Sequence, residues 1–183
     1  MLLCFQVVTV EGQASFDMNN LGKVWQEFIT APGPDTALKV YQMLPAARED
    51  NPPQLAPQLR QLIMDKMNVL ESRIYAGDRN ALQVAFRLLV ISDGEMEKSL
   101  LKIIGYLLRF NTRLFLEELR KHEALVSDLD SLVCSFRLNA PGDKAELNLE
   151  RNIRLKALEY VQDKKLKAIK KKCIKILKKF TVE

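Results

Sequence analysis

Residues 80–89 carry the clearest hydrophobic pattern in the chain. Apolar residues recur with the helical spacing i, i+3, i+4 and i+7 at Leu82, Ala85, Phe86 and Leu89. Further apolar residues widen this stripe until only Gln83 and Arg87 stay clearly polar. A helix that is apolar on nearly every side is typical of a buried position. We therefore expect a buried helix here, at the centre of the fold.

An amphipathic helix follows after a short turn. Its apolar residues are Leu100, Ile103, Ile104, Leu107 and Leu108. Ser92 and Glu95 in the turn have the spacing of a capping box, so we expect the two helices to pack antiparallel. Asn111 then stands where an N-cap would begin a third helix that ends near His122.

The chain before this hairpin predicts three more helices, with breaks where proline and glycine gather. Apolar spacing predicts a helix over residues 21–29 and another over residues 38–44, separated by a Pro-Gly-Pro break. After a loop at residues 49–53, one long helix is predicted from Leu55 to Leu70, with Pro57 in its first turn. Nothing after the first fourteen residues has the pattern of a strand.

The two halves of this region match each other at a nearly constant offset. At an offset of 44 the matches are Ala37 with Ala81, Leu38 with Leu82, Val40 with Val84 and Leu44 with Leu88. At an offset of 45 they are Val24 with Val69, Ile29 with Ile74, Ala31 with Ala76, Leu55 with Leu100, Leu59 with Ile104, Leu62 with Leu107 and Ile63 with Leu108. Helical units that repeat every ~40–47 residues are typical of HEAT and armadillo proteins. The stretch from Val24 to about Leu108 therefore resembles a short HEAT-like α-solenoid with two helices in each unit.

This resemblance implies an all-α fold, a short α-α superhelix of helical hairpins. Residues 114–136 keep a helical stripe and are interpreted as a third, eroded unit. In stacked hairpins the second helices usually line a concave surface that binds partners. The residues expected on that surface are Gln54, Gln58, Gln61, Asp65, Lys98, Lys102 and Arg109. A plain solvated face is the competing interpretation of the same residues.

Residues 144–180 predict a helical hairpin that caps the solenoid. Its first helix runs from about Lys144 to Val161 and its second from about Asp163 to Phe180. Apolar residues of the second helix form a narrow seam at Leu166, Ile169, Cys173, Ile176 and Phe180. We expect one helical domain over residues 15–183, with repeats over 24–136 and the cap over 144–180.

Charge is concentrated in the same C-terminal hairpin. The chain of 183 residues has a formal net charge of +5. Residues 144–183 hold 13 Lys and Arg against 5 Asp and Glu, a balance of +8, so the first 143 residues sum to −3. A basic end on a mildly acidic body indicates an anionic partner or self-complementarity, without selecting either or fixing an oligomeric state.

The lysines of the last helix allow three interpretations: membrane contact, nucleic-acid binding, or a docked seam with solvated lysines. They are Lys164, Lys165, Lys167, Lys170, Lys171, Lys172, Lys175, Lys178 and Lys179. The helix has no arginine and only one aromatic residue, which makes nucleic acid a poor fit. Its seam has no Trp, although interfacial helices usually carry bulky apolar groups. We expect a docked cap with weak anion contacts, and peripheral membrane contact stays an alternative.

The first fourteen residues resemble the end of a secretory signal peptide. They hold a short apolar core, with Gly12 and Ala14 at −3 and −1 of a cleavage site after Ala14. No Lys or Arg precedes the core, and a strand or a docked helix is the alternative. The expected location is periplasmic or secreted, and cytoplasmic if residues 1–14 are not a signal peptide. Cleavage would remove Cys4 and leave Cys134 and Cys173 free to form a disulfide or to stay buried thiols.

The sequence offers little for catalysis. His122 is the only histidine, at a helix end where the helix dipole favours a cation. Glu117 and Glu118 are adjacent, so on a helix they are expected to point ~100° apart without converging. No glycine-rich phosphate loop is present, and one His with two distant Cys is too few ligands for zinc. We expect no enzyme activity and no cofactor.

Two hypotheses for function remain. The first is an exported helical interaction module whose partner is another protein or a peptide. The second is a protein that binds polyanions or a membrane surface through its Lys-rich last helix. Ionic strength separates them, because polyanion binding weakens steeply with salt, whereas binding of an apolar helix in a groove does not.

Overall fold

The structure is a computed structural model that describes residues 17–47, 54–136 and 143–180. Its α-helices are α1 (Met18–Thr30), α2 (Pro34–Met43), α3 (Pro57–Met64), α4 (Met67–Tyr75), α5 (Arg79–Leu88), α6 (Gly94–Phe110), α7 (Thr112–His122), α8 (Leu129–Val133), α9 (Lys144–Tyr160) and α10 (Lys167–Lys179). Two short 3-10 helices are η1 (Glu123–Leu125) and η2 (Lys164–Leu166). Across these ranges no strand is formed, and the prediction of an all-α fold is confirmed. The predicted signal peptide (1–14) and loop (49–53) lie outside the described residues.

Aspartate side chains begin many of these helices. Asp17, Asp78, Asp128, Asp143 and Asp163 each accept a hydrogen bond from a backbone N–H of the first turn that follows. These N–H groups have no partner within the helix, so an N-cap carboxylate satisfies them and favours the start of the helix at that residue. The predicted cap at Asn111 is also formed, with its side chain accepting from the Leu114 N–H at 3.4 Å.

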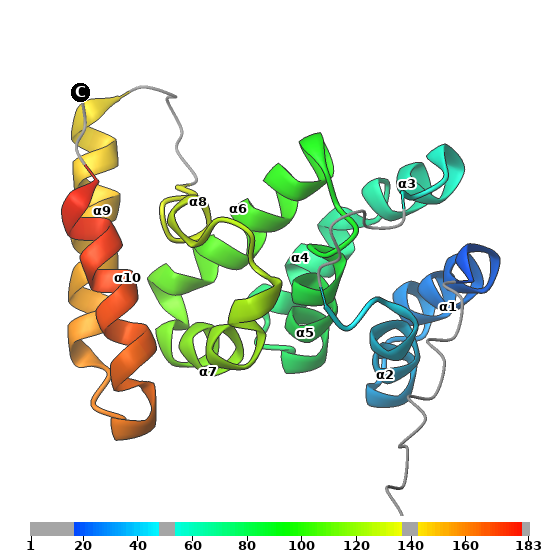
Figure 1. The fold of residues 1–183 in the computed structure, drawn as a ribbon, viewed down its shortest axis with the longest axis horizontal. Coiled ribbons are helices and arrows are strands. Elements are labelled where there is room, and N and C mark those ends of the chain that lie inside the picture. The colour runs from blue at the N-terminus through cyan, green and yellow to red at the C-terminus, as the bar shows by residue number, and fades with distance from the viewer. Residues whose placement is uncertain (1–16, 48–53, 137–142, 181–183) are drawn as a thin grey trace, which may run out of the picture.

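The helices follow one another from one end of the molecule to the other (Figure 1). α1, α2 and α3 lie at the right-hand end, α4 to α6 come next, and α9 and α10 stand side by side at the left-hand end. α1 packs on α2 and α3, α4 packs on α5 and α6, and α2 packs on α5. This arrangement is compatible with a helical repeat fold, and each matched set holds three helices rather than the two expected.

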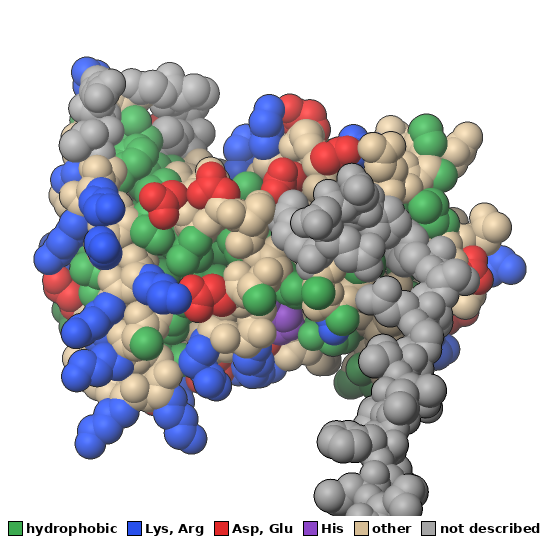
Figure 2. Space-filling view, in the orientation of Figure 1, with side chains coloured by type: hydrophobic (Ala, Val, Ile, Leu, Met, Phe, Trp, Pro, Cys, Tyr) green, Lys and Arg blue, Asp and Glu red, His purple; other side chains and the backbone are tan. Residues whose placement is uncertain are grey.

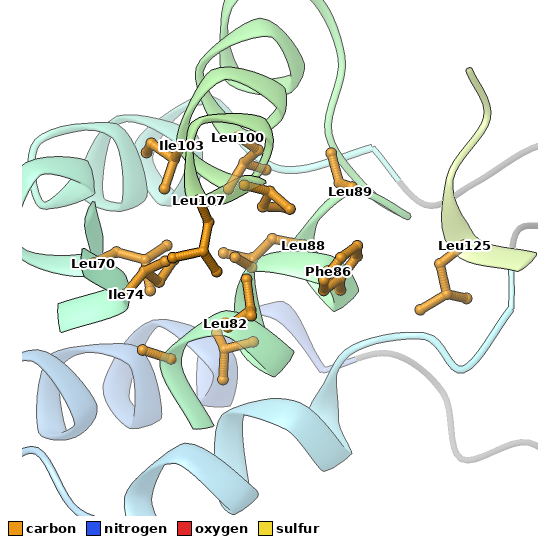
Figure 3. Close-up of a cluster of buried hydrophobic side chains, with 14 of the residues drawn as sticks. Leu70, Ile74, Leu82, Phe86, Leu88, Leu89, Leu100, Ile103, Leu107 and Leu125 are labelled. Atoms are coloured by element: carbon orange, nitrogen blue, oxygen red, sulfur yellow. The ribbon is translucent and has the colours of Figure 1, made fainter. Parts of the chain in front are cut away.

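The core is centred on α5, as predicted. Every residue of this helix from Ala81 to Leu88 is buried except Gln83 and Arg87. Figure 3 shows how Leu70 and Ile74 of α4 and Ile103 and Leu107 of α6 surround it. Burying a large apolar side chain stabilises a fold by ~1.5–3 kcal/mol. This layer therefore holds the successive helices together.

Two local predictions about this region were wrong. The long helix predicted from Leu55 to Leu70 is broken by a turn at Asp65 and Lys66, which divides it into α3 and α4. The capping box of Ser92 and Glu95 does not form, because Asp93 is the N-cap and the Ser92 hydroxyl instead donates to the Leu89 carbonyl. Neither change alters the order of the helices.

The C-terminal helices pack against the last part of the body. α9 lies along α6, and α10 contacts α7, α8 and α9. At their junction the fully buried Arg154 donates to Glu150 at 3.1 Å and to the Val133 carbonyl at 2.8 Å. It also donates to the Ser135 carbonyl at 3.0 Å. Because these carbonyls lie at the last residue of α8 and just beyond it, where helical partners run out, Arg154 ties α9 to α8.

Candidate functional site

The lysines of the last helix form an exposed surface at one end of the molecule. We call this the lysine face, and it consists of the exposed side chains Lys164, Lys165, Lys167, Lys171, Lys172, Lys175, Lys178 and Lys179. Figure 2 shows Lys and Arg side chains gathered over the end formed by α9 and α10. The ninth predicted lysine, Lys170, is half-buried and its ammonium group donates to the Val161 carbonyl at 2.6 Å.

Few carboxylates neutralise the lysine face. Lys172 pairs with Glu123, and Asp163 at the start of the segment pairs with Arg113 at 3.5 Å. The other seven lysines of the face have no ion pair within the described part of the chain. Because these lysines project from a folded helix, their positive charges are held close together.

The apolar side of the same helix faces inward. Leu166, Ile169, Cys173 and Leu177 are buried, whereas Ile176 and Phe180 are half-buried. The predicted seam is therefore correct at its start, but it ends at Leu177. With this side covered, α10 presents charge rather than an apolar stripe. Among the described helices, none combines the length and apolar character needed to cross a bilayer.

The predicted disulfide between Cys134 and Cys173 is not formed, since both cysteines are free. Cys173 lies in the buried seam of α10, and Cys134 is half-buried at the end of α8. Burial raises the pKa of the Cys134 thiol to about 11 and that of Cys173 to about 12. Both groups are therefore neutral thiols at pH 7 and poor nucleophiles.

The residues predicted for a concave surface occupy two helices. Gln54, Gln58, Gln61 and Asp65 are exposed on or beside α3, and Lys98, Lys102 and Arg109 are exposed on α6. An ion pair between Arg60 and Asp93 connects the two helices. Arg109 is already engaged, because its guanidinium donates to Glu150 of α9 at 2.9 Å. A shared binding surface across these residues stays a prediction.

His122 is not the cation that the sequence indicated at the end of α7. It is buried, its ring stacks on Phe86 with a centroid distance of 5.2 Å, and it contacts Tyr41. Its Nδ1 lies 2.9 Å from the Glu118 carbonyl, which can only accept, so Nδ1 carries the proton. In the neutral ring Nε2 then accepts from the Tyr41 hydroxyl at 3.1 Å. Burial lowers the pKa of His122, so its neutral form is favoured.

Glu117 and Glu118 do converge, contrary to the sequence argument, because one arginine reaches both. Arg79 donates to Glu117 at 2.6 Å and also binds Glu118. Glu118 is fully buried and accepts further bonds from Gln83 at 2.9 Å and Lys121 at 2.8 Å. Burial alone would raise the pKa of Glu118, but these donors outweigh it and hold the pKa below its usual value. The cluster therefore fastens α7 to α5.

A cavity of about 220 Å³ opens beside this cluster, between α2, α5 and α7. Tyr41, Asn80, Gln83, Lys121 and His122 supply its polar groups, and Ala37 and Leu38 its apolar ones. The only His of the chain is visible on this face in Figure 2, in purple. Within the described ranges, no three His, Cys, Asp or Glu side chains are grouped to hold a metal ion. Among its polar groups, Tyr41 bonds to His122, while Gln83 and Lys121 donate to Glu118.

Comparison with protein-family models, with curated proteins and with solved structures finds no match for this chain.

Proposed function

We propose that this protein is a non-catalytic helical interaction module that binds an acidic protein surface through its lysine face. The observation that carries the proposal is the set of seven lysines on η2 and α10 without an ion pair in the described ranges. Clustered positive charge on a folded surface attracts an oppositely charged partner and speeds its association. Since the helix is already folded, binding requires no ordering of its backbone.

The chemistry of the face favours protein carboxylates over the other anionic surfaces. Lysine is a point charge, whereas nucleic-acid readout usually relies on arginine forks and stacked aromatic rings, and the face has neither. A membrane-bound amphipathic helix buries an apolar side in the lipid, but α10 buries its apolar side in the protein. An acidic protein segment needs only matching charge.

Binding to a polyglutamate peptide tests this proposal. We expect binding at low salt that weakens steeply between 50 and 200 mM salt, because salt screens exposed charges over about 10 Å. Replacing Lys171, Lys175 and Lys178 by Glu should weaken binding at least tenfold. The melting temperature should hardly change, because all three side chains are exposed and unpaired.

A matched control separates the lysine face from the total charge. Replacing Lys66, Lys98 and Lys102 by Glu changes the net charge by the same amount away from α10. The proposal expects little loss of binding in this variant. Loss in the control alone would move the site away from α10 and overturn the proposal. A single-stranded oligonucleotide of equal charge that binds more tightly than the peptide would also overturn it.

Export is a separate part of the proposal. It depends on residues 1–14, which lie outside the described residues, and stays a prediction. The intact mass of the protein from its native cell tests it. A mass that matches cleavage after Ala14 would support an exported module, and an intact N-terminus would contradict it.

A further inference from the structure

A groove lies at the opposite end of the molecule from the lysine face. Its volume is about 530 Å³, within the ~300–1,000 Å³ that is usual for sites of small molecules. Residues of α1 form one wall, and residues of α3 and the turn after it form the other. The residues that matter here are Lys23, Trp25, Glu27, Ile29, Leu62 and Lys66. Nothing in the proposed function uses this groove.

Trp25, one of the residues that line the groove, has an unsatisfied hydrogen-bond donor. Its side chain is 0% exposed, and its Nε1–H has no hydrogen-bond partner in the part of the chain that the structure describes. Buried indole N–H groups usually find an acceptor, and leaving one unpaired is destabilising. A bound acceptor oxygen would remove this penalty. Because Nε1 is covered, side chains at the rim must move aside for that oxygen to reach it.

The rest of the groove combines positive charge with apolar surface. Lys23 and Lys66 are exposed and neither has an ion pair in the described ranges. The one acidic residue in the wall, Glu27, is already paired with Lys39 of α2 at 3.4 Å. Ile29 and Leu62 are half-buried and leave part of their apolar surface open to the groove. The groove therefore combines an excess of positive charge with apolar surface from Ile29 and Leu62.

We propose that the groove between α1 and α3 binds a small amphipathic carboxylate, such as a medium-chain fatty acid. The alkyl chain would lie against Ile29 and Leu62. The carboxylate would accept a hydrogen bond from the indole N–H of Trp25 and interact with Lys23 and Lys66. Such a ligand would match both the charged and the apolar part of the groove. A simple salt ion would match only the charged part, and an uncharged alkane only the apolar part.

The lone tryptophan makes this proposal directly measurable. Trp25 is the only Trp in the chain, so its fluorescence reports on the groove alone. Decanoate, titrated below its micelle concentration, should change the emission with a saturable curve. Decanol has the same chain length without the charge, and should bind at least tenfold more weakly. No fluorescence response to decanoate, or equal binding of decanol, would overturn the proposal.

Variants assign the binding to these side chains. Replacing Lys23 and Lys66 by Gln keeps the reporter and should weaken decanoate binding about tenfold, the usual size for charged hydrogen-bond partners. The same two changes at Lys175 and Lys178 of α10 are the control and should leave binding unchanged. Equal weakening in both pairs would mean general attraction of the anion by net charge, and would contradict the proposed site.

The indole N–H is tested with Trp25→Phe, which keeps an aromatic ring and removes the donor. Calorimetry then replaces fluorescence, and we expect decanoate to bind at least fivefold more weakly. Unchanged affinity would exclude the indole N–H as part of the site. If this variant does not fold, the paired lysine variants decide the proposal, because exposed lysines are not needed for the core.

Discussion

The helices α2 and α5 share a sequence pattern and differ in how deeply they are buried. Ala37, Val40 and Leu44 match Ala81, Val84 and Leu88, and all six side chains are buried. The two helices differ at another matched pair, Leu38 and Leu82, because Leu38 is 52% exposed and Leu82 is 0% exposed. One apolar face is therefore common to both helices, and a second face is buried only in α5.

The neighbours of the two helices explain this difference. α2 packs mainly on α1 and α5, whereas α5 has α2, α4, α6 and α7 around it. In particular, His122 of α7 stacks on Phe86, while the matching position in α2 is the exposed Gln42. Position within a row of helices thus decides how much of an apolar pattern becomes core.

The largest effect is expected at Phe86, a buried aromatic residue of α5 whose matching residue in α2 is the exposed Gln42. Phe86→Ala should lower the free energy of unfolding by about 3–5 kcal/mol, the usual range for emptying a buried aromatic site. The matched change Gln42→Ala should stay within about 0.5 kcal/mol, as for other surface positions. Urea unfolding of both variants measures the contrast. A small loss at Phe86 would show that α5 is not the centre of the core.

The pair Leu38 and Leu82 isolates the effect of position, because the residue type is the same. Leu82→Ala should destabilise by about 2–5 kcal/mol through the cavity it leaves. Leu38→Ala should change stability by about 0.5 kcal/mol or less, since half of this side chain already contacts water. Similar losses at the two sites would mean that something covers α2 in solution. That outcome would refute the comparison.

Much of the helical pattern could be predicted from sequence because it is local. The stripe of α5, the cap at Asn111 and the start of the α10 seam all depend on residues within one or two turns of each other. The turn at Asp65 and Lys66 could not be predicted, because Ile63, Met67 and Leu70 keep helical spacing across it. A periodic pattern does not reveal where one helix stops and another begins.

The candidate sites show the same limit more strongly. The lysine face was predictable, since composition alone places its charges on one short helix. The burial of His122 was not, because its hydroxyl partner Tyr41 lies 81 residues away in sequence. Likewise, the carbonyls bound by Arg154 belong to residues 19 and 21 positions before it. Contacts of this kind are set by packing, and one sequence does not contain them.

A smaller effect is expected at the first residues of the two helices. Asp78 caps α5 by accepting from two backbone N–H groups at 2.9 and 3.1 Å, whereas the corresponding residue of α2 is Gly33. Asp78→Ala should destabilise by about 0.5–2 kcal/mol, the usual value of an N-cap. Gly33→Asp should stabilise by a few tenths of a kcal/mol, because the backbone there is extended and nothing obstructs a Cβ.

Asp78 also pairs with Arg73, so a second variant is needed to separate the two roles. Asp78→Asn keeps an acceptor oxygen for the cap and removes the negative charge. Thermal unfolding should place this variant between the wild type and Asp78→Ala. If Asp78→Asn destabilises as much as Asp78→Ala, Asp78 stabilises the protein through its ion pair with Arg73 and not through the cap.

The smallest expected effect appears only below neutral pH and arises from His122, the α7 residue whose ring stacks on Phe86 of α5. Its folded-state pKa is lowered by burial, so the unfolded chain binds a proton more readily than the folded protein does. Stability should therefore be constant above pH ~7 and fall as the pH drops below the ordinary His value of ~6.5. His122 is the only histidine, and Glu118, whose pKa is lowered, loses its contribution to stability only at more acidic pH.

The variant His122→Asn keeps a donor near the Glu118 carbonyl and cannot take up a proton. Urea unfolding between pH 5.5 and 7.5 measures the free energy of unfolding of both proteins. This free energy should fall with decreasing pH in the wild type and stay constant in the variant. The same pH dependence in both would show that the pKa of the ring is the same in the folded and the unfolded protein.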